Sequence, residues 1–503
     1  MNFHSFKENV KNISLKYTNI HINFIEFIDN YGFETQIHNN KCKNLESCES
    51  ESFKSESYDL AKDIIKLIDE PTLQILYKIK NFKEYYECGD IYNLWNIIYI
   101  KIAKPIIIIG AGVSGLTIAN GINDNPFLIL EGRNRIGGRV LTSDKNMDMG
   151  AAWIHGSENN PLNKFINYEN MIPVGNCNPW MHSENIQIKY LSNKHEISEK
   201  YRQELAIIWN DIASKIGNLN DDNKTIYEAY NNLINNNYYK NYYENKNQYF
   251  SEEKDFDKDL IDKTENFKKD IESFLYMIEV WCGGSIKNIS SSFLNENNYK
   301  KALFGDYGGS HYLFKNGTKS LIESIINSNK NNIHDKIKYN QIVTNIIYND
   351  YYIEVHTRNG KIYYCNKLCI TVPPGPLKDI CFKPPLSNKH IESLNKIKMG
   401  SYKKIQLEFD SNDLFWDSID NVPMILMYNG DYNDNNIHYK KNKKIQPYIL
   451  WNNYKYLKNK PILEAIFPAE VGWSLTGIKD EEIIDDVLIE LKKYYPFICD
   501  PIS

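Results

Sequence analysis

The chain has 503 residues, and at roughly 150 residues per domain this length suggests about three domains. Hydrophobic residues make up 42% and charged residues 24% of the sequence, which is typical of globular proteins and excludes a fibrous or wholly disordered chain. The 59 Lys and Arg against 64 Asp and Glu leave a net charge of −5, so the composition offers no basic footprint for nucleic acid. We therefore expect a folded protein without a nucleic-acid partner.

The sequence contains no pattern that predicts export or a membrane span. The N-terminus has no apolar run behind its basic residues, as a secretory signal requires. The most apolar stretch, residues 94–110, is interrupted by Lys101 and Lys104 before the ~18 residues of a spanning helix accumulate. The nine cysteines form no CxxC pair and no metal-ligand spacing, which favours reduced thiols and no metal site. We expect a soluble, intracellular protein, most simply a cytoplasmic one.

Residues 1–103 carry helical patterns and no chemical motif. Apolar residues recur every three or four positions over 58–68 and 73–86, and Pro71 suits the first turn of a helix. A polar gap over residues 39–56 interrupts these patterns. We expect a helical N-terminal extension that braces the next domain or binds a protein partner.

At residue 104 the pattern changes to a short apolar run, residues 106–109, as in a strand buried on both faces of a parallel sheet. Directly after it, Gly110, Gly112 and Gly115 form a GxGxxG motif that opens an apolar, helix-like segment. Gly110 allows the tight turn, Gly112 lets the backbone approach a pyrophosphate, and Gly115 lets the helix pack closely on the strand. The helix N-terminus presents N–H groups to the phosphates. This context predicts a dinucleotide-binding strand, turn and helix.

A second apolar run, residues 127–130, ends in Glu131, about 20 residues after the first glycine of the motif. The Glu131 carboxylate is placed to accept hydrogen bonds from an adenosine ribose. Beyond it, Arg133, Gly138 and Arg139 combine guanidinium groups with a glycine turn, where a second approach to the pyrophosphate lies. A plain NAD domain does not need this second group.

The stretch over residues 105–161 resembles the FAD-dependent amine oxidase family, which includes monoamine oxidases, polyamine oxidases and lysine-specific histone demethylases. The resemblance implies FAD as the cofactor, with Glu131 on its ribose, Arg139 on its pyrophosphate and Arg133 beside its adenosine. It also implies the α/β fold class: a Rossmann-like FAD-binding domain with an α+β substrate-binding domain, here preceded by the helical N-terminal extension.

Residues 148–156, which end in Trp-Ile-His-Gly, are most similar to polyamine oxidases. In the family this stretch passes beside the flavin, so the resemblance implies that His155 lies in the amine pocket, neutral and able to accept a hydrogen bond from the substrate. Taken alone, His155 would more often be a structural histidine. Trp451 also falls in family order, where it either lines the substrate cavity or fills the core.

Two later stretches follow the family as well. The backbone of Val343 lies in a stretch similar to the family's adenine-binding strand, although a core strand valine is the alternative. Residues 371–409 resemble the return to the substrate domain and include Lys404, which takes the place of the lysine that holds a water against flavin N5. Strand alternation puts Lys404 on the face opposite Ile405. A solvated edge lysine, or a one-residue slip to Lys403, is the alternative.

The predicted domains alternate along the chain. We expect a helical extension over 1–103, parts of the FAD-binding domain over 104–160, 315–375 and an incomplete 466–503, and parts of the substrate domain over 161–314 and 376–465, with an Asn-rich insertion over 218–263. The family's later Thr-x-Trp, Gly-Ser-Tyr and Ala-Gly-Glu motifs have no counterpart here. Either the chain is a shortened form or its C-terminal portion has been lost, and in both cases we expect the flavin end of FAD to be weakly held.

The resemblance implies oxidation of a C–N bond in a polyamine-like, small-molecule amine. The imine product would be hydrolysed to an aldehyde and an amine, and O2 would be reduced to H2O2. One alternative is a catalytically weak or inactive truncated flavoprotein that acts as a structural or interaction module, with residues 1–103 as its contact. Another is a histone-demethylase-like amine oxidase, which the acidic balance of charge does not support.

Overall fold

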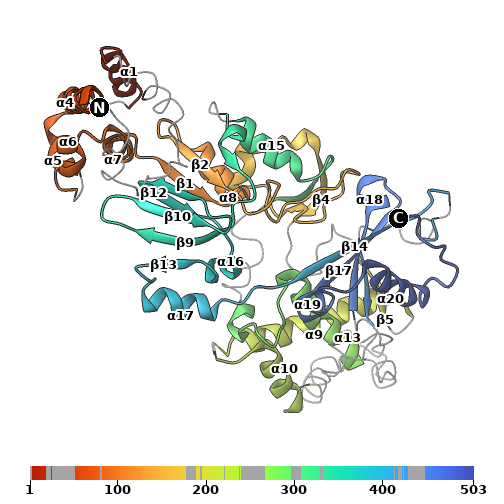
Figure 1. Cartoon of the computed structure of the whole chain (residues 1–503). Coiled ribbons are helices and arrows are strands. Elements are labelled where there is room, and N and C mark those ends of the chain that lie inside the picture. The colour runs from red at the N-terminus through yellow and green to blue at the C-terminus, as the bar shows by residue number, and fades with distance from the viewer. Residues whose placement is uncertain are drawn as a thin grey trace, which may run out of the picture. The chain divides into compact units, whose positions relative to one another are not determined.

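The computed structural model (Figure 1) describes the chain except for several ranges of residues. These are residues 1–2, 18–23, 25–50, 80–81, 177–187, 193–194, 197, 220, 222, 237, 239–266, 296–307, 329–331, 413, 417–421, 423 and 429–447. The described chain forms two compact units. The first unit comprises Met1–Ala151 and Thr318–Lys398, and the second comprises Ala152–Gly317 and Met399–Ser503.

The first unit begins with helices. They are α1 (Phe3–Ser14), α4 (Glu51–Lys66), α5 (Glu70–Leu76), α6 (Phe82–Cys88) and α7 (Ile91–Ala103). Pro71 lies in the first turn of α5, where its missing N–H leaves no bond unmade. The helix expected over 73–86 is divided, because the chain turns after Leu76 and helix α6 begins at Phe82. Buried side chains from all five helices form one core around Trp95.

Helix α7 joins these helices to the rest of the first unit. Tyr99 of α7 packs with Tyr364 in a small buried cluster, and the Tyr351 hydroxyl donates a hydrogen bond to the carbonyl oxygen of Lys78. The helix ends at Lys104, which has a left-handed φ of 49°. The residue after Lys104 is a proline, and a residue that precedes proline disfavours the helical region.

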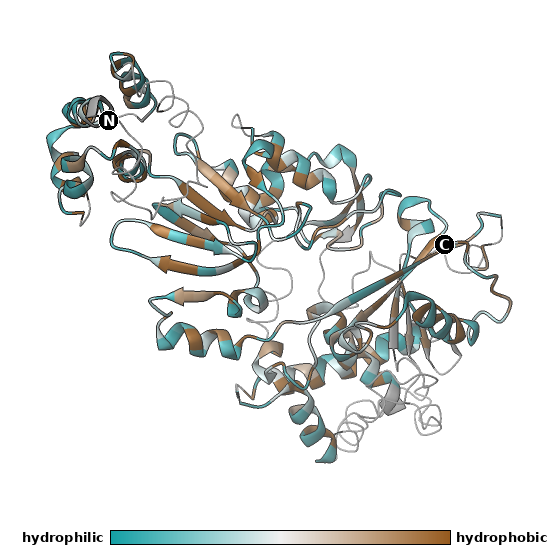
Figure 2. Ribbon diagram, viewed as in Figure 1, coloured by the Kyte–Doolittle hydropathy of each residue, from teal (hydrophilic) through white to brown (hydrophobic). Residues whose placement is uncertain are grey.

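A four-stranded parallel sheet follows, with the order β12, β1, β2, β8. Its strands are β1 (Ile106–Ile109), β2 (Phe127–Leu130), β8 (Ile337–Lys338) and β12 (Lys367–Ile370). Every residue of β1 and β2 is buried, which explains their unbroken apolar sequence in Figure 2. Helix α8 (Val113–Asn120) packs on β1, and α15 (Lys319–Asn327) packs on α8. The predicted succession of strand, glycine turn, helix and strand is therefore confirmed.

A second sheet in the same unit has the order β11, β10, β9, β13. Its strands are β9 (Val343–Tyr348), β10 (Ile353–Thr357), β11 (Ile362–Cys365) and β13 (Cys381–Lys383). Buried residues of both sheets, among them Ile107, Leu130 and Ile346, share one core. The remaining regular elements of the unit are η4 (His334–Lys336), α16 (Pro374–Lys378) and α17 (Asn388–Lys396).

The second unit is built on a six-stranded sheet with the order β14, β17, β16, β15, β5, β6. Its strands are β5 (Ile188–Ser192), β6 (His195–Glu196), β14 (Tyr402–Glu408), β15 (Met424–Tyr428), β16 (Tyr448–Asn453) and β17 (Ile462–Pro468). Strands β14, β17, β16 and β15 pair antiparallel, whereas β15 and β5 pair parallel. Strand β17 is buried along its whole length, in the middle of this network.

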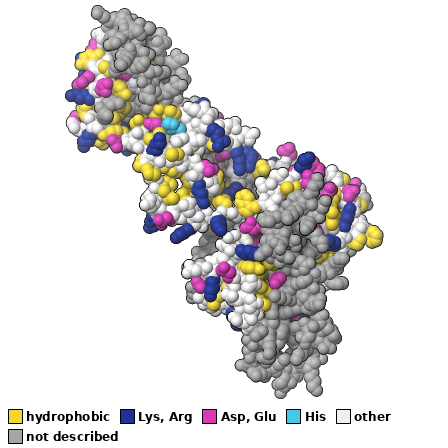
Figure 3. Space-filling model, turned by 60° about the horizontal axis from the view of Figure 1, so that its bottom comes forward, with side chains coloured by type: hydrophobic (Ala, Val, Ile, Leu, Met, Phe, Trp, Pro, Cys, Tyr) yellow, Lys and Arg dark blue, Asp and Glu magenta, His cyan; other side chains and the backbone are white. Residues whose placement is uncertain are grey.

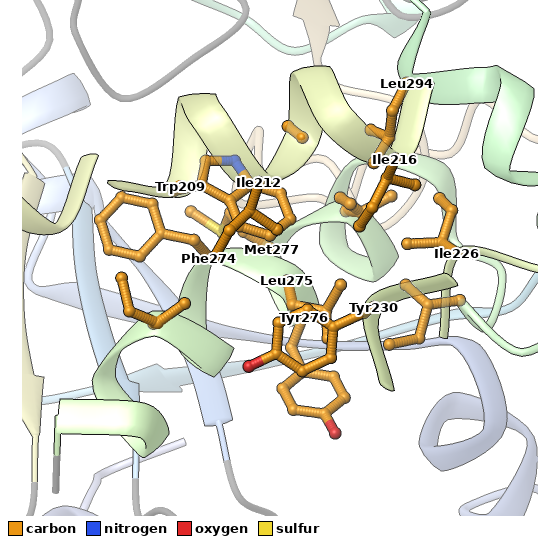
Figure 4. Close-up of a cluster of buried hydrophobic side chains, with 14 of the residues drawn as sticks. Trp209, Ile212, Ile216, Ile226, Tyr230, Phe274, Leu275, Tyr276, Met277 and Leu294 are labelled. Atoms are coloured by element: carbon orange, nitrogen blue, oxygen red, sulfur yellow. The ribbon is translucent and has the colours of Figure 1, made fainter. Parts of the chain in front are cut away.

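Helices cover this sheet on both faces. On one face lie α9 (Glu199–Gly217), α10 (Ile226–Asn235) and α13 (Phe267–Cys282), and their side chains, such as Trp209 and Phe274 (Figure 4), share a core with Leu450 and Ile466. On the other face, Trp451 and Leu407 share a core with residues of α20 (Asp480–Lys492). Short elements complete this part: η3 (Ser291–Leu294), α18 (Tyr454–Lys458) and α19 (Ala469–Ser474).

A separate three-stranded sheet in the second unit has the order β3, β7, β4. Its strands are β3 (Trp153–Ile154), β4 (Met171–Asn176) and β7 (Ser310–Phe314), which pair antiparallel. Two 3-10 turns, η1 (Pro161–Phe165) and η2 (Tyr168–Asn170), connect β3 to β4. His155, which we predicted to lie in the amine pocket, directly follows β3.

The boundaries between the two compact units differ from the domain boundaries that we predicted. The first unit ends at Ala151 and resumes over Thr318–Lys398, whereas we expected boundaries after residues 160, 314 and 375. The largest difference is at residues 466–503, which we assigned to the FAD-binding domain. They belong to the second unit, because the apolar face of α20, including Ile483 and Leu491, is buried against the six-stranded sheet. The sequence pattern identified the helix but could not show which sheet it covers.

Several other expectations can be compared with the structure. Trp451 is fully buried and its indole N–H points to the sulfur of Met427, which is the core alternative rather than a cavity wall. Of the Asn-rich insertion expected over 218–263, α10 is described, and residues 239–263 lie outside the described residues. The six described cysteines are free thiols. Among the described helices, none has the length and apolar character to cross a membrane.

Candidate functional site

The turn between β1 and α8 requires glycine at two positions. Gly110 has a φ of +102°, and its N–H donates to the carbonyl oxygen of Leu130 over 2.8 Å. A Cβ atom on Gly115 would lie 1.9 Å from the carbonyl oxygen of Gly110. Any side chain at position 115 would therefore push α8 away from β1. These are the roles that the GxGxxG motif predicts for its first and third glycines.

Thr371 braces this turn from the neighbouring strand, a role that we did not predict. Its hydroxyl donates to the carbonyl oxygen of Ile109 over 2.7 Å and lies 3.3 Å from that of Gly110. The contact exists because β12 lies beside β1, with Ile370 opposite Ile109. A threonine directly after a predicted strand was visible in the sequence, but its neighbour was not.

The N-terminus of α8 is open to a ligand. Its N-cap residue, Gly112, provides no side-chain hydrogen bond, so the first-turn N–H groups are available to an anion that the helix dipole favours. A second glycine turn lies beside it, since the N–H of Gly137 donates to the carbonyl oxygen of Ala111 over 2.9 Å. A Cβ built on Gly112 would lie 3.9 Å from the Cα of Gly138. Two glycine turns thus form a backbone cradle that fits a dinucleotide diphosphate.

Glu131 stands at the end of β2 next to this cradle. Its side chain is 7% exposed, and its carboxylate accepts hydrogen bonds from the backbone N–H groups of Ala111 at 2.7 Å and Arg133 at 2.9 Å. Two carboxylate oxygens offer about four lone pairs, so two N–H bonds leave room for ligand hydroxyls. The two backbone bonds also fix the carboxylate in place beside the glycine turn. Glu131 therefore stabilises the turn and keeps lone pairs that could accept hydrogen bonds from a ligand.

The three arginines around the second glycine turn, the predicted Arg133 and Arg139 and the intervening Arg135, behave differently from one another. Arg133 donates to the carbonyl oxygen of Gly138 over 3.0 Å, and Arg135 donates to the same oxygen over 2.9 Å. These two guanidinium groups hold the second glycine turn in shape. Arg139 is exposed, and within the described chain no hydrogen bond or ion pair involves its guanidinium group. Arg139 is therefore the arginine of this group whose charge is available to a ligand.

Val343 begins strand β9, and its side chain is buried in the core that both sheets of the first unit share. This is the core environment that the alternative interpretation expected. Only the backbone of Val343 is left to meet a ligand, which is also the group that the family resemblance implies. The adjacent Ile342 is 38% exposed and lies 3.5 Å from the position that a Cβ on Gly132 would take.

In the second unit, His155 faces a second histidine that sequence reasoning missed. The Nδ1 atoms of His155 and His311 lie 3.1 Å apart, with the rings perpendicular. Trp153 stacks beside His155 and meets His311 edge-on. His311 lies in β7, which pairs with β3, and this long-range pairing brings the two histidines together. A histidine next to Gly-Gly-Ser was the one sequence signal that could have pointed to it.

Burial keeps this histidine pair uncharged. It lowers the pKa of His155 to about 4, and burial together with the proximity of His155 lowers the pKa of His311 to about 3. Both imidazoles are therefore neutral near pH 7. Because the two Nδ1 atoms share one proton, one ring donates and the other accepts, so their Nε2 atoms have opposite hydrogen-bonding roles.

Lys404 lies on β14 as the alternation predicts. Ile405 is buried on the opposite face, and Lys404 is 12% exposed with its Nζ 3.5 Å from the Glu464 carboxylate. Lys404 is therefore not a solvated edge lysine. Lys403 is on the face of Ile405, so the one-residue slip would put the amine on the wrong side of the sheet.

The predicted site residues thus belong to two groups. The glycine motif, Glu131 and the arginines come together in the first unit. His155 and Lys404 belong to the second unit. His155 directly follows strand β3 of the three-stranded sheet, and Lys404 lies on strand β14 of the six-stranded sheet.

Comparison with known proteins identifies the family. The sequence model described as flavin containing amine oxidoreductase matches residues 113–503. The chain belongs to this family. Membership implies a flavin cofactor, and the glycine cradle beside Glu131 fits the diphosphate and ribose of such a dinucleotide.

Curated relatives in this family are distant and carry different names. The chain is 26% identical over 348 residues to the corticosteroid-binding protein of Candida albicans, which covers 63% of this chain and 62% of that protein. It is 23% identical over 456 residues to lysine-specific histone demethylase 1 homolog 3 of Arabidopsis thaliana, 80% of this chain and 26% of that protein. Rice polyamine oxidase 5 is 23% identical over 421 residues, 79% of this chain and 73% of that protein. This chain therefore spans less than two thirds of the first two relatives.

Proposed function

We propose that this protein is an FAD-dependent amine oxidase that acts on a polyamine-like small molecule. The observation that carries the proposal is the pair of glycine turns beside Glu131, because it supplies a diphosphate cradle and a ribose acceptor in a chain of the flavin containing amine oxidoreductase family. The similarity of residues 148–156 to polyamine oxidases, and the rice relative of that name, favour a polyamine-like substrate.

Each predicted site residue of the first unit would have a role in holding the cofactor. The backbone of Gly112 and Gly138 accommodates the diphosphate, which first-turn N–H groups and the Arg139 guanidinium neutralise. Glu131 accepts hydrogen bonds from the ribose hydroxyls with the lone pairs that the backbone N–H groups leave over. The backbone of Val343 meets the adenine.

The second unit supplies the groups for the amine. When bound, FAD supplies the two-electron acceptor that amine oxidation needs. His155 is neutral because of its burial, so it accepts a hydrogen bond from the substrate amine without repelling its positive charge. Lys404 holds a water molecule through its ammonium group on the same side of the sheet as Glu464. Oxygen is the final acceptor in this proposal, and H2O2 the product.

Two measurements test this function. The purified chain should show the visible absorbance of bound flavin, and it should release H2O2 with polyamines in a panel that also contains monoamines and methylated histone peptides. A flavin-bound protein that oxidises only the peptides would favour the demethylase alternative, which the Arabidopsis relative supports by name. A flavin-bound protein that is silent on the whole panel would contradict the oxidase proposal.

A non-catalytic binding role is the second candidate. The Candida albicans relative is named for a ligand that it binds rather than for a reaction. In that case the helices of residues 1–103, which form their own core and join the unit through α7, would serve as a contact for a protein partner. An absence of flavin absorbance after reconstitution with excess FAD would favour this candidate.

A further inference from the structure

A row of polar side chains crosses three adjacent strands at one side of the six-stranded sheet. Gln406, Glu464 and Asn452 lie opposite one another on the adjacent strands β14, β17 and β16, so they share one face. Glu464 is fully buried. Its carboxylate accepts hydrogen bonds from the Gln406 amide at 2.6 Å and the Asn452 amide at 2.8 Å, and the Tyr454 hydroxyl lies 3.5 Å away.

Lys404 lies diagonally across from this carboxylate. It is two residues before Gln406 on β14 and so lies on the same face of the sheet. Its Nζ is 3.5 Å from a Glu464 oxygen, while its side chain is 12% exposed. A carboxylate with no exposed surface is costly unless a positive charge and hydrogen bonds compensate it. Lys404 supplies that charge, and two amides supply the hydrogen bonds.

We propose that Glu464 is the positioning residue of Lys404: its carboxylate fixes the ammonium group at one place on the sheet. The catalytic purpose of this positioning rests on the proposed function, whereas the geometry of the pair does not. Because the amides of Gln406 and Asn452 hold the carboxylate from both neighbouring strands, it is a rigid counter-ion rather than a mobile one. It also selects position 404 over 403, whose side chain lies on the opposite face.

The first test measures how firmly the Lys404 amine is held. In a Lys403→Arg background, the rate of acetylation of Lys404 by acetic anhydride is followed by mass spectrometry at pH 8, where only the uncharged amine reacts. Glu464→Gln removes the carboxylate that lies 3.5 Å from the Lys404 Nζ and restrains it, so labelling should become several-fold faster. Glu408→Gln is the matched control, since Glu408 lies further along the same face and accepts a hydrogen bond from Ser503. An equal labelling rate in the parent and in Glu464→Gln would overturn the proposal.

The second test does not depend on one variant being well folded. Lys404→Met leaves the buried Glu464 carboxylate without its counter-ion and should lower the melting temperature. Glu464→Leu should also lower it, because it leaves the Lys404 ammonium group without its carboxylate partner. The double variant should melt above Lys404→Met, because both charges are gone and the pocket is apolar. Additive decreases would show that the two side chains are not coupled and would contradict the proposal.

The readouts separate this inference from the proposed function. Faster labelling in Glu464→Gln together with unchanged amine oxidation in Lys404→Met would support the pairing and remove the catalytic role of Lys404. Unchanged labelling would overturn the positioning role whatever the oxidase assay shows.

Discussion

The two groups of site residues are built in different ways. In the first unit the ligand would meet backbone: two glycine turns, a helix N-terminus and one carboxylate, all between residues 110 and 139. In the second unit the proposed site groups are side chains, and each depends on strands that are far apart in the sequence, as with His155 and His311 or Lys404 and Glu464. The first kind of site depends on the absence of side chains, whereas the second depends on strand register.

This difference predicts where the chain is most sensitive. In the first site, a methyl group added to a glycine should abolish ligand binding, because the neighbouring backbone is already in contact and leaves no room for it. In the second site, a lost side chain should change chemistry or charge while the sheet stays intact.

The largest expected effect is that of Gly115→Ala. Its Cβ would lie 1.9 Å from the Gly110 carbonyl oxygen, so α8 would have to leave β1. We expect a loss of several kcal/mol in unfolding free energy, as for other backbone clashes, and no measurable FAD binding. Chemical denaturation and FAD fluorescence titration measure both. Gly121→Ala at the end of the same helix is the control, since its Cβ would be 3.5 Å from the nearest atom; similar losses in both variants would contradict the packing argument.

The next largest effect should be kinetic. Lys404→Met should slow flavin reduction or reoxidation about a hundredfold, in the range of a positioned proton-transfer group, while FAD affinity is unchanged. Stopped-flow absorbance measures the two half-reactions separately. Lys403→Met, on the opposite face of the strand, should react like the parent protein. Parent-like rates in Lys404→Met would exclude the catalytic role.

Glu131→Gln tests the carboxylate that accepts hydrogen bonds from the backbone and, in the proposed function, from the ribose of FAD. Losing charge-assisted hydrogen bonds to the ribose costs about 1.5–3 kcal/mol, so FAD affinity should fall roughly ten- to a hundredfold. The apoprotein should also melt earlier, because the amide N–H2 group would face one of the two backbone N–H donors, Ala111 or Arg133. Fluorescence titration and a melting curve without FAD distinguish the two effects. Unchanged cofactor retention on a desalting column would rule out the ribose contact.

The histidine pair gives a pH dependence whose sign is fixed. The folded-state pKa values of about 4 for His155 and about 3 for His311 lie below the ordinary 6.5, so the unfolded chain binds protons more readily. Their contribution to stability is complete above pH 6.5 and is lost as the pH falls from there to about 4 for His155 and about 3 for His311, which amounts to roughly 2 kcal/mol for each histidine at pH 5. Denaturation curves of the parent and of a His155→Gln/His311→Gln variant, compared at pH 7 and pH 5, measure it. An equal acid loss in both would contradict this origin.

Much of the first site was predictable because its residues are neighbours in the sequence. The strand over 106–109, the glycine turn and Glu131 lie in one continuous segment, and their spacing alone sets the geometry. Alternation along a single strand was enough to place Lys404 on the correct face. Local pattern therefore decided the elements and the side on which each residue lies.

The rest required knowledge of which strands pair. Thr371 reaches the glycine turn only because β12 lies next to β1, and His311 meets His155 only because β7 pairs with β3. Glu464 is the single charged residue in an otherwise apolar run, and such a run predicts a buried strand rather than a functional site. Residues 466–503, which we expected in the FAD-binding domain, belong to the second compact unit, and the amphipathic pattern of their helix could not predict which sheet it covers.

The smallest expected effect is that of Arg139→Ala. The guanidinium is exposed and, within the described part of the chain, has no hydrogen-bond or ion-pair partner, so the melting temperature of the apoprotein should not change. Its contact with a diphosphate would be partly screened by solvent, so FAD affinity should fall only a fewfold, by about 1 kcal/mol. Because salt screens exposed charges, the decrease should shrink as the ionic strength rises from about 0.01 to about 0.5 M, which shortens the Debye length roughly sevenfold. Arg135→Ala should behave in the opposite way, lowering the melting temperature because its guanidinium holds the carbonyl of Gly138. An affinity loss for Arg139→Ala that is independent of salt, or one that comes with a lower melting temperature, would show that this arginine supports the turn rather than the cofactor.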